Sequence, residues 1–150
     1  MPDLTEADQR RVALGNETMR ATVQIVSCCV QAATLVILEN PHSSMLWFAP
    51  EVKELLKHVS CLTHVCDFCQ FGTAWRKRTR FASWCGSAFK PLTKKICKQK
   101  GKICSSTLAP HVRLTGHSAS GKCFLIRKAE AYPDLLAAML ADWLAELCIP

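Results

Sequence analysis

The spacing of hydrophobic positions predicts a long helix at the start of the chain. Apolar residues from Met19 to Val30 recur at three- and four-residue steps, as they do on one face of an α-helix. Thr5 precedes acidic residues, a pattern typical of an N-cap and a first helical turn. We therefore expect a helical N-terminal segment over residues 1–33, with an interruption near Gly15.

The next hydrophobic patterns predict strands and two further helices. Residues 34–38 form a short, β-branched apolar run, typical of a fully buried strand in a parallel sheet. Residues 62–71 alternate loosely between apolar and polar positions, and residues 79–84 follow a turn, so both are expected to be extended. Pro50 and Pro133 favour first helical turns, and the apolar face of the last helix predicts core packing.

The order of these elements predicts an α/β fold. Helix, strand, helix, strand, strand, basic loop and helix form a layer that is too small to be a complete doubly wound sheet. A chain of 150 residues is long enough for one domain with its own core. The expected parts of this single domain, residues 1–150, are the helical segment 1–33, a strand–helix–strand–strand core 34–84, a basic irregular segment 85–128 and a C-terminal helix 129–150.

The composition argues against disorder, a membrane span and secretion. Hydrophobic residues make up 49% of the chain, too many for a disordered protein. No apolar run reaches the roughly 18 residues that span a bilayer. Residues 1–11 lack the positive start and apolar core of a secretory signal. We therefore expect an intracellular protein, nuclear or cytoplasmic, with no membrane partner and with its ten cysteines reduced.

Charge is strongly segregated along the chain. Residues 68–129, which we call the acid-free segment, hold fourteen Lys or Arg and no Asp or Glu. The rest of the chain carries five basic and all twelve acidic residues, so the net charge of +7 combines +14 with −7. Such segregation favours a polyanionic partner, and nucleic acid is the commonest because each neutralised phosphate releases counterions. The alternative is a solvated basic face with no specific role.

A carboxylate follows the first predicted strand. Glu39, Asn40 and Pro41 come directly after residues 34–38. In open α/β sheets ligands bind beyond the carboxyl ends of strands, so Glu39 would be well placed to contact an exocyclic amine or a ring nitrogen. Asn-Pro would hold it in a fixed turn. The alternative is an ordinary turn at a strand end.

A run of cations flanked by aromatic residues lies between Phe71 and Phe81. Guanidinium groups bind phosphate through paired N–H donors, and an aromatic ring can stack on a base. Alternation along a strand would place every second cation on one face, whereas the alternative is a solvated strand edge. The candidate nucleic-acid-binding residues are Trp75, Arg76, Lys77, Arg78, Arg80, Lys94 and Lys95.

Cysteine and histidine spacing in the basic irregular segment predicts a metal site. Cys97, Cys104, His111 and His117 are separated by six, six and five residues. Zinc prefers four thiolate or imidazole ligands, and a bound ion would explain how so basic a segment folds. These four residues are therefore the candidate zinc ligands.

Other cysteines leave alternatives open. Cys85 or Cys123 could replace either of the two histidines. His64, Cys66 and Cys69 form a second candidate group, although alternation along a strand would place Cys66 and Cys69 on opposite faces. A further alternative is no metal at all, with reduced thiols and surface histidines.

Taken in order, these motifs resemble the later part of a C5-cytosine DNA methyltransferase domain of the divergent phage and retroelement type. Residues 36–41, Val-Ile-Leu-Glu-Asn-Pro, resemble the family's strand that ends in Glu-Asn-Val or Glu-Asn-Pro. Residues 71–78, Phe-Gly-Thr-Ala-Trp-Arg-Lys-Arg, resemble its Tyr-Gly-x-Pro-Gln-x-Arg-x-Arg motif, and residues 132–136 resemble the phage-type ending. The resemblance covers about residues 30–145.

The resemblance implies a role for each motif. Glu39 would hold a flipped cytosine, and Arg76 and Arg78 would assist at the active site, so these three are the candidate catalytic residues. The implied fold is a partial Rossmann-like methyltransferase sheet with flanking helices. The irregular basic loop region beside it is the part that the cysteine and histidine spacing predicts to be closed by zinc. The implied partner is nucleic acid, DNA in particular.

The chain departs from that family where the chemistry would be done. Ala74 and Trp75 stand where Pro-Gln is usual, no glycine-rich loop is present for S-adenosylmethionine, and no cysteine follows a proline as the family's nucleophile does. We therefore expect a partial or degenerate module that binds nucleic acid, binds no S-adenosylmethionine alone and is inactive alone. A second copy or a complementary methyltransferase half is the expected protein partner. The alternative is a small zinc-stabilised nucleic-acid-binding protein with no enzyme ancestry.

Overall fold

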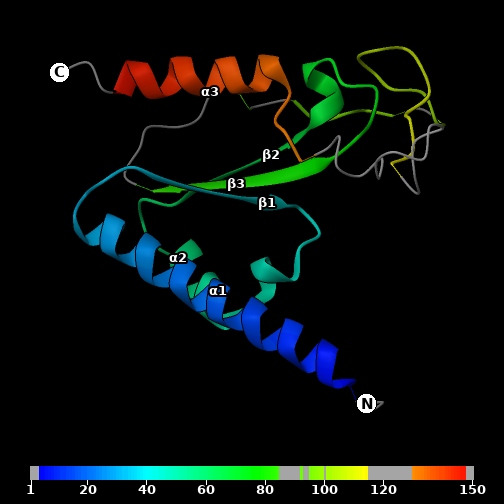
Figure 1. Ribbon diagram of the computed structural model, residues 1–150. Coiled ribbons are helices and arrows are strands. Elements are labelled where there is room, and N and C mark those ends of the chain that lie inside the picture. Colours follow the sequence, from blue (N-terminus) through cyan, green and yellow to red (C-terminus); the bar gives the residue numbers. More distant parts are fainter. Residues whose placement is uncertain (1–3, 85–91, 93–94, 100, 115–129, 148–150) are drawn as a thin grey trace.

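The computed structural model describes residues 4–84, 92, 95–99, 101–114 and 130–147. Within these ranges the chain forms three layers (Figure 1). A small sheet lies between helix α3 on one face and helices α1 and α2 on the other. The predicted mixture of helices and strands is therefore confirmed.

The middle layer is a three-stranded antiparallel sheet. β1 (Val36–Pro41) and β2 (Leu62–Asp67) both pair with β3 (Arg78–Trp84), which lies between them. The prediction that residues 34–38 form a fully buried strand of a parallel sheet is wrong, because β1 is a half-buried edge strand with an antiparallel partner. The pairings among the described strands do not confirm a Rossmann-like sheet.

Both faces of the sheet are covered, so consecutive side chains of one strand enter different cores. Phe81 packs with Leu136 of α3 (Asp134–Leu147) on one face. Trp84 packs with Val26 of the N-terminal helix on the other face. A strand that is covered on both faces has a continuous run of apolar residues, whether its neighbouring strands are parallel or antiparallel. The apolar run of β1 therefore could not show the direction of its partner strand.

Helices α1 (Glu6–Gln31) and α2 (Pro50–Leu56) cover the second face. The Thr5 hydroxyl accepts a hydrogen bond from the Asp8 backbone N–H, which caps α1 as predicted. The helix continues through Gly15, so the expected interruption is wrong. One glycine inside a helix lowers the stability of that helix by only about 1 kcal/mol relative to alanine. The helical turns on both sides of Gly15 offset this loss.

The end of β2 decides the geometry of the site. Residues 62–71 are not one strand: β2 stops at Asp67, and a single 3-10 turn, η2 (Phe68–Phe71), follows. Gly72 then takes a left-handed φ of 89°, which glycine adopts without steric cost. The side chains after Asp67 therefore no longer alternate as they would on a strand. A second 3-10 turn, η1 (Met45–Phe48), precedes α2 and was not predicted.

The Glu-Asn-Pro motif lies within β1 and not beyond it. Glu39 is opposite Phe81, and Pro41 is opposite Thr79 at the end of the ladder. Glu39 and Asn40 therefore lie in the strand, and the expected turn begins at Pro41, whose carbonyl accepts a hydrogen bond from the Ser44 backbone N–H at 2.9 Å. Proline is compatible with the end of an edge strand because it has no N–H to leave unpaired there.

Candidate metal centre

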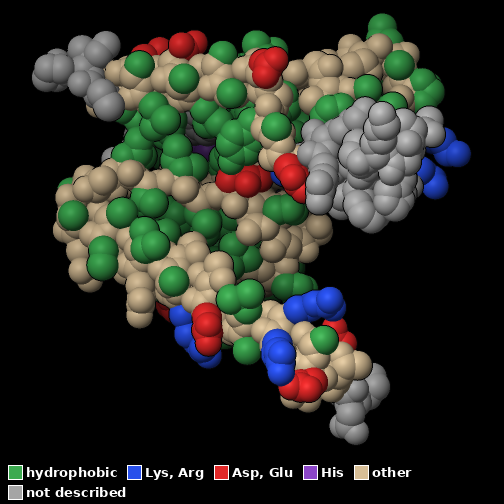
Figure 2. Space-filling model, viewed as in Figure 1, with side chains coloured by type: hydrophobic (Ala, Val, Ile, Leu, Met, Phe, Trp, Pro, Cys, Tyr) green, Lys and Arg blue, Asp and Glu red, His purple; other side chains and the backbone are tan. Residues whose placement is uncertain are grey.

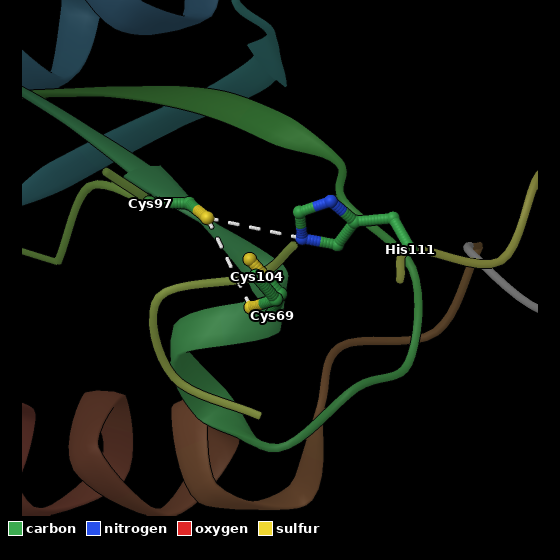
Figure 3. A group of neighbouring side chains, drawn as sticks. All are labelled: Cys69, Cys97, Cys104 and His111. Carbon is green, nitrogen blue, oxygen red and sulfur yellow. Dashed lines mark hydrogen bonds between the residues drawn. The ribbon is translucent and has the colours of Figure 1, made fainter. Parts of the chain in front are cut away.

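Three cysteines and one histidine meet at one end of the sheet (Figure 3). The sulfurs of Cys69, Cys97 and Cys104 and a ring nitrogen of His111 all lie within 4.8 Å of one another. The Cys97 sulfur is 3.9 Å from the Cys104 sulfur and 3.8 Å from His111 Nε2. A tetrahedral zinc ion with Zn–S bonds of about 2.3 Å separates its ligands by about 3.8 Å. The group therefore has the size of a four-coordinate metal site.

The ligand residues come from separate parts of the chain. Cys69 lies on η2 directly after β2, whereas the other three lie in the basic irregular segment. All three cysteines are buried and His111 is half-buried. A metal ion here would join the loop to the sheet in a region that has few other core-forming side chains.

A tight loop brings the later ligands together. The Cys104 backbone N–H donates to the Ala109 carbonyl at 2.9 Å. Ile103 and Pro110 form an isolated antiparallel bridge across the same loop. These bonds close the loop so that His111 lies beside the cysteines, with its ring directed toward the Cys97 sulfur (Figure 3).

Backbone N–H groups are directed at the Cys104 sulfur. Ser106 and Thr107 donate to it at 3.4 and 3.5 Å. Burial alone raises the pKa of the Cys104 thiol, but these donors outweigh burial and lower that pKa to about 6. Burial raises the pKa of the neighbouring Cys69 thiol to about 12. The cluster thus favours a thiolate at Cys104, and thiolate is the form that binds a metal.

A buried carboxylate links the metal cluster to the basic run. Asp67, at the end of β2, is fully buried and accepts the Cys97 backbone N–H at 2.7 Å. It also accepts from Nε of Arg76 and from Nε and Nη2 of Arg78, each at 3.1 Å. Burial raises the pKa of Asp67, but these N–H donors outweigh it and hold the pKa below its usual value. Asp67 therefore stays ionised and fully hydrogen-bonded.

Cysteine and histidine spacing located most of this cluster. The structure brings Cys97, Cys104 and His111 together, as the spacing predicts. His117 lies outside the described residues, and Cys69 completes the group of four. Cys85 and Cys123, the alternative ligands, also lie outside the described residues, so their roles stay open.

The sequence indicates Cys69 only as a member of the second candidate group, with His64 and Cys66. Cys66 lies instead in the hydrophobic core, where burial raises the pKa of its thiol to about 12. Because β2 ends at Asp67, Cys69 turns away from the strand direction and toward the loop. The signal for this was Gly72, which marks a turn shortly after Cys69.

Two cations of the predicted nucleic-acid-binding run contact aromatic rings inside the protein. Lys77 Nζ lies 4.8 Å from the centre of the Phe68 ring and 3.9 Å from Glu39 Oε1. The Arg80 guanidinium lies 5.2 Å from the centre of the Trp47 ring. These two side chains therefore stabilise the packing around the sheet, and their binding of nucleic acid stays a prediction.

The remaining candidate nucleic-acid-binding residues differ in their surroundings. Trp75 is half-buried, and its ring Nε1 has no hydrogen-bond partner among the described residues. Lys95 Nζ lies 5.7 Å from the centre of the Phe71 ring. Lys94 lies outside the described residues. Their binding of nucleic acid also stays a prediction.

Glu39 lines a separate cavity of about 370 Å³ beneath α3, where hydrophobic side chains gather (Figure 2). Ile37, Phe81 and Tyr132 are among its other walls. Burial raises the pKa of Glu39, and the charge of Lys77 and a hydrogen bond from the Tyr132 hydroxyl oppose that rise without cancelling it. Burial, together with the Glu39 charge, raises the pKa of Tyr132 to about 12, so its hydroxyl stays a donor.

The three candidate catalytic residues do not meet in the described structure. Arg76 and Arg78 pair with Asp67, and neither of them lines the Glu39 cavity. The cation beside Glu39 is Lys77.

Comparisons with protein-family models, curated proteins and solved structures found no match for this chain. In the described part of the chain, every helix is too short or too polar to cross a bilayer. Among the features described above, the group of three cysteines and one histidine is the one whose ligand types and distances define a specific chemical role, which is metal binding.

Proposed function

We propose that this chain is a zinc-stabilised module that binds nucleic acid and is related to the C-terminal half of C5-cytosine methyltransferases, without activity of its own. The supporting observation is the Cys69, Cys97, Cys104 and His111 cluster, which lies within the acid-free segment. A site with four protein ligands leaves no open position for substrate, so its role is structural.

Zinc fits this cluster better than other biological metals. Thiolate and imidazole ligands exclude calcium and magnesium, which require oxygen ligands. Tetrahedral sites with three thiolates and one imidazole are a common structural zinc arrangement. The distances of 3.8 and 3.9 Å from the Cys97 sulfur agree with the edges of such a tetrahedron.

Nucleic acid is the proposed partner because the metal would fold a segment that has no acidic residue. The acid-free segment carries fourteen Lys or Arg, and Asp67, just before it, is already paired with two arginines. Folding such a segment would bring positive charges together without intervening acidic residues of the same segment. A phosphate backbone would be attracted to this charge whatever its base sequence.

The relation to methyltransferases is supported by the Glu39 cavity. One oxygen of this carboxylate, Oε1, is buried and has no hydrogen-bond partner among the described residues, although Lys77 Nζ lies 3.9 Å away. A carboxyl group with a raised pKa in an apolar cavity is suited to exchange a proton or hydrogen bond with a base.

Native mass spectrometry of the purified chain, before and after chelation and with S-adenosylmethionine supplied, tests the proposal. We expect one zinc ion per chain and no bound cofactor, together with salt-sensitive binding to duplex DNA. A folded chain that retains no metal, or one that binds no nucleic acid, would overturn the proposal. Bound cofactor or methyl transfer would overturn the proposed lack of activity.

The methyltransferase relation has its own test. Duplexes with a cytosine opposite an abasic site are compared with fully paired duplexes, because an unpaired base is easier to extrude. We expect the chain to prefer the unpaired cytosine, and Glu39→Gln to lose that preference while keeping its affinity for paired DNA. A wild-type chain that binds both duplexes equally would favour the alternative without enzyme ancestry. Thymine opposite the abasic site is the control.

A further inference from the structure

A pocket of about 390 Å³ lies against the metal cluster. Its lining includes the ligand His111 and three cations from different parts of the chain, and the other lining side chains are uncharged. Arg76 precedes β3 by two positions. Lys102 lies between Cys97 and Cys104, and Arg113 lies two residues after His111. None of the described residues that line this pocket is acidic.

Lys102 and Arg113 are the cations whose charge is not offset. With Zn²⁺ bound, three thiolates and a neutral imidazole give the cluster a formal charge of −1, and Asp67 contributes another −1. Arg76 and Arg78 offset these two charges, because both pair with Asp67. Among the described residues, Lys102 and Arg113 form no ion pair and are both exposed. The pocket therefore attracts an anion.

Arg76 is held in place for such an anion. Its Nε donates to Asp67 at 3.1 Å, and its Nη1 donates to Gln99 Oε1 at 3.3 Å. Gln99 is fixed in turn by its own donation to the Gly101 carbonyl at 2.6 Å. A guanidinium held on two sides loses little conformational entropy when its remaining N–H groups bind an oxygen.

We infer that this pocket binds phosphate groups of a nucleic-acid backbone through Lys102, Arg113 and the outer edge of Arg76. The inference rests on the proposed function and specifies where the nucleic acid binds. Lys102 lies on the loop that the metal closes and Arg113 lies two residues beyond its last ligand, so metal binding would hold both cations at the pocket. The other cations of the predicted run contact groups of the protein: Lys77 and Arg78 pair with carboxylates, and the Arg80 guanidinium lies over the Trp47 ring.

The test compares two double variants of the zinc-loaded full chain. Lys102→Ala with Arg113→Ala removes the pocket's exposed cations, and Lys53→Ala with Lys57→Ala removes two lysines of the α2 region as a matched control. Duplex affinity is measured between about 50 and 200 mM salt. Each lost phosphate contact lowers the slope of log K against log salt by about 0.9. We expect the pocket variant to lose about 1.8 from the slope and the control variant to keep it.

The outcomes separate this inference from the proposed function. A wild-type chain that binds DNA, with the same salt slope in the pocket variant, would overturn the pocket and leave the proposed function intact. A wild-type chain without salt-sensitive binding would overturn the proposed function. Should the double variant lose its zinc, the single variants Lys102→Gln and Arg113→Gln decide: each should lower the slope by about 0.9, and an unchanged slope in both would overturn the pocket.

Discussion

The Asp67 carboxylate accepts the backbone N–H of Cys97 at 2.7 Å, and this bond joins the sheet to the metal cluster. The same carboxylate fixes Arg76 and Arg78. One fully buried side chain therefore positions a metal ligand and two cations at once. Its ion pairs are retained because each of its oxygens has N–H donors, which offsets the cost of removing the charge from water.

Asp67→Asn should destabilise the protein by about 2–4 kcal/mol, because the two arginines would lose their charge partner in a partly buried setting. Urea unfolding of the zinc-loaded protein measures this change. The control is Asp142→Asn, at an exposed position on α3, which should change stability by less than about 0.5 kcal/mol. Equal losses in the two variants would contradict the role of Asp67.

Cys69→Ser should reduce retention of zinc, whereas His117→Ala should leave one zinc ion per chain. The reason is that Cys69 completes the described group of four, so His117 is not needed as a ligand. Metal analysis after dialysis against a weak chelator measures both variants, with Cys28→Ser, an exposed thiol on α1, as the control. Loss of zinc from the His117 variant alone would show that the spacing prediction had named the right fourth ligand.

Glu39→Gln should change the pH dependence of stability. The folded pKa of Glu39 lies above the unfolded value of 4.5, so its contribution to stability is present below that pH and is lost as the pH rises through the folded pKa. Glutamine cannot ionise, so the variant should gain stability relative to the wild type between about pH 4.5 and neutrality. Urea unfolding at several pH values measures the difference, and a constant difference would argue against a buried carboxyl group.

Leu136→Ala should cost about 2–5 kcal/mol, because Leu136 is fully buried between α3 and the sheet. Its neighbour Leu135 is 53% exposed, so Leu135→Ala is a matched control with a much smaller expected cost. Urea unfolding of both variants tests whether α3 packs as the third layer. Similar losses at the two positions would mean that the helix faces another way.

Local signals predicted the elements well. The N-cap at Thr5, the helix that starts at Pro50 and the strand that ends at Trp84 all form as the sequence indicates. These features depend on residues close together in the chain, such as a hydroxyl that reaches an N–H three residues away. The end of β2 at Asp67 was missed because a loose alternation continued past it.

Part of the candidate site could also be predicted. Six residues lie between Cys97 and Cys104 and another six before His111, and all three serve one cluster because a single loop carries them. Cys69 could not be added from spacing, since it lies 28 positions before Cys97. The ion pairs of Arg76 and Arg78 with Asp67 could not be predicted either. The same local sequence is compatible with cations that are exposed to solvent and with cations that pair with a buried carboxylate.

The sequence by itself determined where helices and strands form, how the charge is segregated and which loop carries most of the metal ligands. These properties follow from periodicity, capping and residue chemistry within short stretches. Only the tertiary structure decided that β3 lies between β1 and β2, that Cys69 joins the loop ligands, and that Asp67 holds two of the cations. These relationships join residues far apart in the chain, and the packing of the three layers selects them.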